Sequence, residues 1–294
     1  MTNTKGIILA GGYGSRLYPL TFRTSKQLLP VYDKPMIYYP LSTLMNAGIR
    51  DILIISTEKD IPRFKDLLND GSNIGISITY KVQKEPRGIA EAFLIGANFI
   101  KNDNVCLILG DNIFYGKNFN MLLEKAISNF EKGFSSIFGV KVDNPSEFGV
   151  IEFDSNNSIK RIIEKPHKTQ SNYIVSGLYF YTNNVIEVAS NLTRSVRGEL
   201  EITDINNYYL NQKKLDLCRL DSNFSWLDTG TYNSLIEASR YFQDHEKQTG
   251  EKIACIEEVA LKLNLIDKSK FIDIANTMST SNYGKYLLAK AKNY

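Results

Sequence analysis

A short apolar segment that runs directly into a glycine-rich loop is the feature that most constrains how this chain can fold. Residues 7–10 read Ile-Ile-Leu-Ala, and Gly11-Gly12-Tyr13-Gly14-Ser15-Arg16-Leu17 follows at once, with Lys26 ten residues after Arg16. Glycines allow backbone N–H groups to approach an anion closely. Arginine adds a planar fork of donors, and lysine adds a compact charge. The segment therefore predicts a polyphosphate site at the start of an α/β domain.

Two common phosphate-binding loops do not match this segment. A Walker loop requires a second glycine followed by Lys-Ser/Thr, and the chain has no such run. The dinucleotide fingerprint requires a third glycine, but Leu17 stands in its place. Taken alone, the loop is also consistent with a glycine-rich β-to-α turn that binds nothing.

The first half of the chain alternates short apolar runs with longer amphipathic ones. We expect strands at residues 6–9, 51–56, 77–81, 105–109 and 135–140. We expect helices at residues 40–46, 62–69, 89–99 and 119–129, with Gly48 ending the first of them. This alternation predicts βαβ units and a mostly parallel sheet flanked by helices. Ligands bind beyond the carboxyl ends of such strands, so the glycine-rich loop and Asp111 should lie close together.

The pattern changes after about residue 141. Residues 148–153 and 159–163 alternate around a turn-rich segment at 154–158, which predicts an antiparallel hairpin-like insertion. A strand at 173–181, a helix at 203–210 and a strand at 214–220 are expected next. The tail beyond about residue 239 is predicted to be mostly helical.

Three polar side chains stand out beside the glycine-rich loop. Asp111 follows a buried-strand pattern, and Asp228 lies in a second turn-like segment. Such carboxylates suit Mg²⁺, although an aspartate at a turn or a helix cap is an equal reading of the residues alone. Gln83 carries a carboxamide whose donor and acceptor match the edge of thymine or uracil, but a solvated glutamine is the simpler interpretation. His167 and His245 form neither a metal motif nor a base–nucleophile pair.

Composition excludes several classes of protein. The 294 residues are 43% hydrophobic with a net charge of +3 and no basic run, so nucleic acid is not an expected partner. No signal-peptide pattern and no apolar stretch of membrane-spanning length is present, so we expect no membrane association. The cysteines at 106, 218 and 255 show no paired spacing, and we expect buried free thiols and a cytoplasmic protein.

A series of motifs resembles the sugar-phosphate nucleotidylyltransferase family, and within it the branch that acts on dTTP and glucose 1-phosphate. The loop at 11–17 with Ser25-Lys26 is similar to the family's phosphate loop. Further matching blocks occur in the family's order at residues 28–40, 109–116, 164–166, 177–181, 197–204 and 226–231. Because the blocks extend over nearly the whole chain, the resemblance is far more specific than any single motif.

The resemblance implies a Rossmann-like fold and a defined reaction. The sugar phosphate would attack the α-phosphorus of dTTP in line and release pyrophosphate, giving dTDP-glucose as a first step towards dTDP-deoxysugars such as dTDP-rhamnose. Asp111 and Asp228 would hold Mg²⁺. The catalytic residues implied are Arg16, Lys26, Lys165 and Arg197.

The same resemblance implies a set of substrate-binding residues. They are Leu9, Gly11, Gly12, Gly14, Ser15, Gln83, Pro86, Gly88, Asp111, Asn112, Gly149, Glu164, Lys165, Val175, Tyr179 and Trp226. Some positions depart from the usual family pattern: Arg87 and Glu91 replace Asp and Gln, Phe148 replaces a frequent Tyr, and residues 254–258 lack a common proline.

The implied organisation is a catalytic domain at 1–240, with a sugar-binding part at about 141–230, and a helical segment at 241–294 that makes oligomer or regulatory contacts. The family implies a homotetramer with feedback by a dTDP-sugar at a second site. Three other functions remain open: a uridylyltransferase or other sugar-1-phosphate nucleotidylyltransferase, a non-catalytic regulatory relative, and a Rossmann dehydrogenase. The last of these expects an acidic residue at the end of the second strand, where Ile55-Ser56-Thr57 stands.

Overall fold

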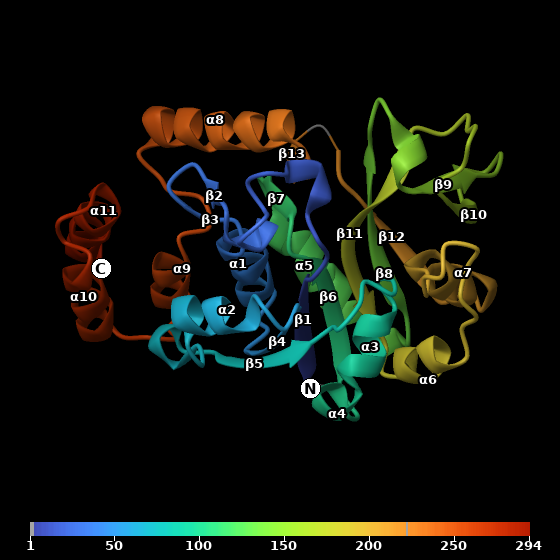
Figure 1. The fold of residues 1–294 in the computed structure, drawn as a ribbon, viewed down its shortest axis with the longest axis horizontal. Helices are drawn as coiled ribbons and strands as arrows, with labels where there is room; N and C mark the ends of the chain where they lie inside the picture. Colours follow the sequence, from blue (N-terminus) through green and yellow to red (C-terminus); the bar gives the residue numbers. More distant parts are fainter. Residues whose placement is uncertain (1–2, 222) are drawn as a thin grey trace.

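A computed structural model describes residues 3–221 and 223–294, and its centre is a mixed sheet of nine strands (Figure 1). The sheet runs in the order β10-β9-β11-β6-β1-β4-β5, with β8 beside β11 and β12 beside β8. The strands are β1 (Thr4–Ala10), β4 (Asp51–Ser56), β5 (Ser77–Val82), β6 (Asn104–Leu109), β8 (Ser135–Lys141), β9 (Gly149–Phe153), β10 (Ile159–Glu164), β11 (Tyr173–Tyr181) and β12 (Leu215–Arg219). No helix in these described ranges is long and apolar enough to cross a membrane.

Parallel pairing organises the first half of the chain, as the alternation predicted. Strand β1 lies between β4 and β6, and β4 pairs with β5, all in parallel. Strand β11 then reverses direction and pairs antiparallel with β6, β8 and β9. The carboxyl ends of β1 and β6 therefore lie at the same edge of the sheet. The glycine-rich loop starts there, and Asp111 follows β6 there.

Helices cover both faces of the sheet (Figure 1). Neighbouring residues of one strand face opposite sides: Leu53 packs into the core that holds Phe93, and Ile54 into the core that holds Phe64. Continuous apolar strands arise in this way, because both faces are buried. The helices are α1 (Tyr38–Asn46), α2 (Ile61–Leu68), α3 (Glu91–Ile95), α4 (Ala97–Ile100), α5 (Phe119–Asn129), α6 (Val185–Ser190) and α7 (Ile202–Asn211).

One of the predicted helices is interrupted in the structure. Residues 89–99 do not form a single helix, because α3 ends at Ile95 and α4 begins at Ala97. Gly96 joins the two, and a β-carbon there would lie 3.1 Å from Ile7 Cδ1. The close approach to the sheet leaves no room for a side chain, and glycine has a low helix propensity, so the helix is weakest at this residue.

The antiparallel insertion is confirmed. Strands β9 and β10 pair antiparallel. The carboxylate of Asp154 accepts hydrogen bonds from the backbone of Asn156 at 2.9 Å and of Ser158 at 3.0 Å, which closes the turn between the two strands. The insertion stands at one end of the molecule, to the right in Figure 1.

Two short strand pairs were not predicted. Strand β7 (Asn112–Gly116) pairs antiparallel with β13 (Phe224–Asp228), and β2 (Pro30–Val31) pairs with β3 (Lys34–Pro35). In the first pair Asp228 stands opposite Asn112. This contact places the second predicted metal ligand beside the first.

The tail is helical, as expected, and its last two helices pack around Phe271 and Leu287. Its helices are α8 (Tyr232–Thr249), α9 (Ile256–Lys262), α10 (Lys268–Thr277) and α11 (Asn282–Lys290). Helix α8 runs across the predicted boundary at residue 240. The three cysteines are buried and unpaired, as predicted.

Candidate active site

The glycine-rich loop leaves β1 and turns back through a single 3₁₀ turn at Ser15–Leu17. Gly14 starts this turn in the left-handed region at φ 59°, and its carbonyl accepts a hydrogen bond from Thr21 Oγ1 at 2.8 Å. Leu17 is fully buried and anchors the turn. Arg16 beside it remains half exposed and reaches Glu147 Oε2 at 3.5 Å. The loop thus presents a guanidinium at the mouth of the site.

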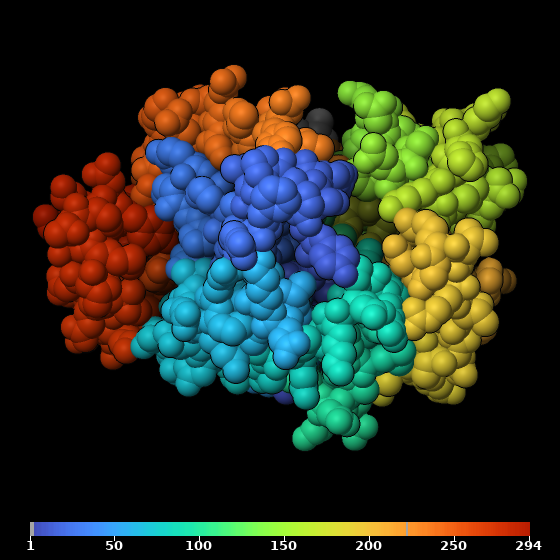
Figure 2. Space-filling view, viewed as in Figure 1, coloured from blue at the N-terminus to red at the C-terminus, as the bar shows by residue number. Residues whose placement is uncertain are grey.

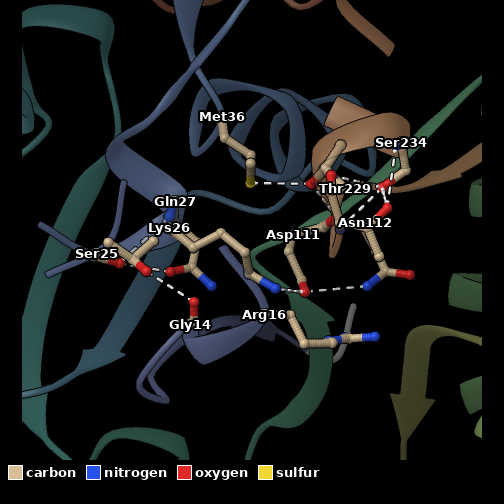
Figure 3. A network of polar contacts seen from close by, with 12 residues as sticks. Gly14, Arg16, Ser25, Lys26, Gln27, Met36, Asp111, Asn112, Thr229 and Ser234 are labelled. Atoms are coloured by element: carbon tan, nitrogen blue, oxygen red, sulfur yellow. Dashed lines mark hydrogen bonds and ion pairs between the residues drawn. The ribbon is translucent and has the colours of Figure 1, made fainter. Parts of the chain in front are cut away.

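Lys26 and Asp111 form a partly buried ion pair, as Figure 3 shows. Lys26 opens a 3₁₀ turn, and Asp111 follows β6 directly and also accepts a hydrogen bond from Asn112 Nδ2 at 3.2 Å. Burial alone would raise the pKa of the Asp111 carboxyl. The charge and hydrogen bond of Lys26 outweigh burial and lower that pKa below its usual value.

Asp228 is brought to the same place by the pairing of β13 with β7. Thr229 stabilises the position of Asp228 beside Asp111, because its Oγ1 donates a hydrogen bond to the Asp111 carbonyl at 2.8 Å. Burial and the neighbouring charge of Asp111 raise the pKa of Asp228 to about 6. A β-carbon on Gly230 would lie 2.8 Å from Arg16 Nη2 and 3.1 Å from Asp228 Oδ1, so both groups border this glycine.

These two carboxylates fit a divalent cation. Burial and the charge of Asp111 raise the pKa of Asp228 more than Lys26 and Arg16 lower it, so a cation bound by both carboxylates would stabilise their ionised forms. No cluster of three or more His, Cys, Asp or Glu side chains with metal-binding geometry occurs within the described residues. A site with two protein carboxylates suits Mg²⁺, which takes most of its remaining ligands from water and substrate phosphates.

A first cavity of about 200 Å³ opens beside the glycine-rich loop, and we call it the nucleotide-side cavity. Gln83 is 6% exposed at its wall, and its Nε2 donates to Glu91 Oε2 at 2.8 Å and to the Gly88 carbonyl at 3.4 Å. The predicted residues that line it are Leu9, Gly11, Gly12, Lys26, Gln83, Pro86, Gly88 and Asp111.

The backbone conformation and close packing at this wall require a glycine at residue 88. Its φ is +103°, and a β-carbon there would lie 2.3 Å from the Leu200 carbonyl. Leu200 N donates to the Arg87 carbonyl at 2.8 Å, so the segment around Gly88 is held against the start of α7. A side chain at residue 88 would separate the two segments.

A second cavity of about 180 Å³ lies between the sheet and the insertion, and we call it the sugar-side cavity. Trp226 Nε1 donates to Asn112 Oδ1 at 2.8 Å and to the Ser176 carbonyl at 2.9 Å. Tyr179 is buried there, and burial raises the pKa of its hydroxyl. The predicted residues that line it are Arg16, Asp111, Asn112, Gly149, Glu164, Lys165, Val175, Tyr179, Arg197, Trp226 and Asp228.

Charged groups dominate one wall of the sugar-side cavity. Arg197 contacts Glu201 at 2.7 Å, Glu164 at 3.1 Å and Glu199 at 3.4 Å. Thr203 Oγ1 donates to the second oxygen of Glu164 at 2.5 Å. Burial opposes the charge of Arg197, but the hydrogen bonds that it donates to Glu201 and the charges of the three carboxylates raise its pKa. Lys165, by contrast, is exposed, with its backbone in the left-handed region at φ 41°.

The two cavities share the side chains of Ile89, Leu109, Asp111 and Glu199. Figure 2 shows the surface hollowed where the N-terminal residues meet those near 90 and near 200. Gly14 and Ser15 line neither cavity; Gly14 precedes the 3₁₀ turn and Ser15 is its first residue. The site is therefore one continuous cleft with Asp111 at its centre.

Several residues that line the cleft were not predicted from the sequence. Glu147 faces Arg16 across the cleft, Glu199 and Glu201 pair with Arg197, and Thr203 donates to Glu164. The alternating charges of Arg197-Gly198-Glu199-Leu200-Glu201 were the available signal. A larger groove of about 1430 Å³ lies along the outer side of the insertion, and none of the predicted site residues lines it. Cavity volume alone therefore does not identify the candidate active site.

Comparisons with known proteins identify relatives that extend over nearly the whole chain. The nucleotidyl transferase family matches residues 5–245. A glucose-1-phosphate thymidylyltransferase of Neisseria meningitidis is 52% identical over 98% of this chain and 99% of its own length. One from Mycobacterium tuberculosis is 50% identical over 97% of this chain and 98% of its own.

Solved structures with the same fold include two sugar nucleotide enzymes. A Bacillus anthracis structure described as a glucose-1-phosphate thymidylyltransferase with sucrose bound has a TM-score of 0.76 and 40% identity. It covers 82% of this chain and 96% of its own. A UDP-glucose pyrophosphorylase with UDP-glucose has a TM-score of 0.73 and 26% identity over 83% of this chain and 100% of its own.

Proposed function

Because the chain belongs to the nucleotidyl transferase family, we propose that it transfers the thymidylyl group of dTTP to α-D-glucose 1-phosphate, giving dTDP-glucose and pyrophosphate. One observation carries the proposal: two cavities of suitable chemistry meet at Asp111. The nucleotide-side cavity has glycines and a buried amide, and the sugar-side cavity has cations and hydrogen-bonding groups.

The reaction needs positioning and charge neutralisation rather than a general base. A phosphate monoester has a second pKa near ~6, so glucose 1-phosphate is largely dianionic at neutral pH and is already a nucleophile. Its phosphate oxygen attacks the α-phosphorus, and pyrophosphate leaves from the opposite side. Neither histidine lines the two cavities, which agrees with this chemistry.

The residues around the nucleotide-side cavity bind dTTP in this proposal. The backbone of Gly11, Gly12, Gly14 and Ser15 surrounds the triphosphate, while Arg16 and Lys26 neutralise its charge and that of the departing pyrophosphate. The base lies against Leu9, Gln83, Pro86 and Gly88.

The sugar-side cavity binds glucose 1-phosphate. Lys165 and Arg197 orient the attacking phosphate, and Glu164 and Asn112 bind sugar hydroxyls. Gly149, Val175, Tyr179 and Trp226 form the walls. Arg197 must exchange part of its contact with Glu164, Glu199 and Glu201 for the substrate phosphate.

We assign a Mg²⁺ site to Asp111 and Asp228, whose carboxylates fit a divalent cation by number and charge. Bound there, Mg²⁺ would neutralise charge on the phosphate oxygens. Lys26 keeps Asp111 ionised, so that this carboxylate is available as a ligand at neutral pH.

The remaining proposals concern organisation. We propose a catalytic domain at 1–240, with its sugar-binding part at about 141–230, and a C-terminal segment at 241–294 that serves a homotetramer and feedback by a dTDP-sugar. Cytoplasmic localisation is proposed as well, supported by three buried free thiols. Entry of the product into the dTDP-rhamnose pathway is the corresponding metabolic proposal.

Release of pyrophosphate tests the function directly. It should require dTTP, glucose 1-phosphate and Mg²⁺, with each omitted in turn as the control. A uridylyltransferase is the competing assignment, because the UDP-glucose pyrophosphorylase shares the fold and Gln83 suits uracil as well as thymine. Higher kcat/KM with UTP than with dTTP would support that alternative and contradict ours.

A further inference from the structure

The carboxylate of Glu91 lies against the amide of Gln83, at the wall of the nucleotide-side cavity. The amide nitrogen donates to Glu91 Oε2 at 2.8 Å and to the Gly88 carbonyl at 3.4 Å. Gln83 is 6% exposed, so its amide has little access to water. Its hydrogen-bond partners are therefore the groups around it.

Both neighbours on this side of the amide are acceptors. An ionised carboxylate and a backbone carbonyl carry no hydrogen to donate. Turning the amide by 180° would place its oxygen against two other oxygens and leave buried polar groups unpaired. The pair of acceptors therefore permits only one orientation of Gln83.

The oxygen of the same amide faces Gly11. A β-carbon on Gly11 would lie 2.9 Å from Gln83 Oε1, and Gly11 and Gln83 both line the nucleotide-side cavity. A glycine at this position leaves the oxygen uncovered. With its nitrogen occupied and its oxygen open, Gln83 offers the cavity an acceptor.

We infer that Glu91 is a positioning residue that sets base specificity by holding Gln83 as a hydrogen-bond acceptor towards the base. The inference deepens the proposed function and rests on it. At the N3 position, which this acceptor would face, thymine and uracil present an N–H donor, whereas cytosine presents an unprotonated nitrogen and carries its amino donor one position away, on C4. Glu91 thus favours thymine and uracil over cytosine, and it does not distinguish thymine from uracil.

A carboxylate at residue 91 is better suited to this task than an amide. A glutamine there could turn together with Gln83, so that the pair of amides would have two self-consistent orientations. Glu91 has no such alternative. The variant Glu91→Gln therefore removes the bias while keeping the shape of the side chain.

The test compares kcat/KM for dTTP, dUTP and dCTP in the wild type, Glu91→Gln and Glu91→Leu. The matched control is Glu85→Gln, which alters a carboxylate on the same segment that is exposed and pairs with Arg87. The ratio of dCTP to dTTP should rise about 3- to 10-fold in Glu91→Gln, the worth of one neutral hydrogen bond, and at least as much in Glu91→Leu. The ratio of dUTP to dTTP should stay unchanged, and Glu85→Gln should leave both ratios unchanged.

The inhibition constant of dCTP against dTTP gives the same comparison where dCTP turnover is slow. Unchanged dCTP ratios in both Glu91 variants overturn the inference and leave the proposed function intact. An equal rise for dUTP and dCTP indicates general loosening of the cavity and also overturns it. A wild type that prefers UTP to dTTP overturns only the proposed function, and the UTP to CTP ratio then tests Glu91. A wild type that prefers CTP overturns both.

Discussion

The two halves of the cleft are built in different ways. The nucleotide-side cavity is formed mainly by loops that follow parallel strands, and its wall depends on backbone contacts such as that of Gly88 with Leu200. The sugar-side cavity is assembled from β7, β11, β13, the insertion and the start of α7, and charged side chains pair across it. We therefore expect nucleotide binding to depend mainly on backbone shape, and sugar-phosphate binding mainly on a balance of charges.

The largest effect is expected where the two halves meet. Asp111→Asn keeps the shape of the side chain but removes the negative charge that pairs with Lys26. Loss of several kcal/mol of metal-assisted stabilisation corresponds to about a 10³-fold fall in turnover. Steady-state pyrophosphate release over a Mg²⁺ titration measures it, with the exposed Asp143→Asn as the matched control. Near-normal Mg²⁺-dependent rates in both Asp111→Asn and Asp228→Asn would refute the metal assignment.

A smaller and one-sided effect is expected for Lys165→Ala. Removing a charged phosphate contact costs on the order of 1.5–3 kcal/mol, and here the loss should fall on glucose 1-phosphate rather than on dTTP. Kinetics with each substrate varied separately measure the division, with Lys168→Ala as a nearby exposed control that lines neither cavity. An effect confined to dTTP would assign Lys165 to nucleotide binding and contradict the division of the cleft into two halves.

The wall of the nucleotide-side cavity at Gln83 should distinguish between bases mainly by hydrogen bonding and only weakly by contact with the thymine methyl group. One methyl in an apolar pocket contributes about 1–3 kcal/mol, or 10–200-fold. A nucleotide panel should therefore rank dTTP above dUTP, with UTP detectable and CTP and ATP far worse. Since dUTP has the same sugar as dTTP, it isolates the methyl group. Equal competition by CTP would show that Gln83 does not read the base.

The smallest effect is expected for Thr203→Val, which removes the hydroxyl that donates to Glu164. Arg197 still holds the other oxygen of that carboxylate, so the loss should be about 0.5–1.5 kcal/mol, or 3–10-fold, in kcat/KM for glucose 1-phosphate. Thr203→Ser restores the hydroxyl and serves as the matched control. Loss of dTTP use as well would indicate that the two halves are not independent.

Much of the nucleotide side could be predicted from the sequence. Parallel strands end at a common edge, so the closeness of the glycine-rich loop to Asp111 followed from the βαβ pattern. The structure confirms this closeness, because Gly11, Gly12 and Asp111 line the same cavity, in which Lys26 pairs with Asp111. The resemblance to a known family supplied Gln83 and Gly88, which both line the nucleotide-side cavity.

Less of the sugar side could be predicted. The pairing of β13 with β7 joins segments far apart in the chain, and short strands carry little periodicity of their own. The contacts of Arg197 with Glu199 and Glu201, and that of Arg16 with Glu147, were not expected. Roles for these site residues stay predictions until the variants are measured.

By itself, the sequence determined the local structure and the chemical groups available: the glycine-rich turn, the buried parallel strands, the hairpin insertion, and the identity of each acid, base and amide. Only the tertiary structure decided which of these groups meet. Burial beside Asp111 raises the pKa of Asp228, and two acceptors orient Gln83. Both effects depend on distance and desolvation between residues on different elements, and spacing along the chain does not specify either quantity.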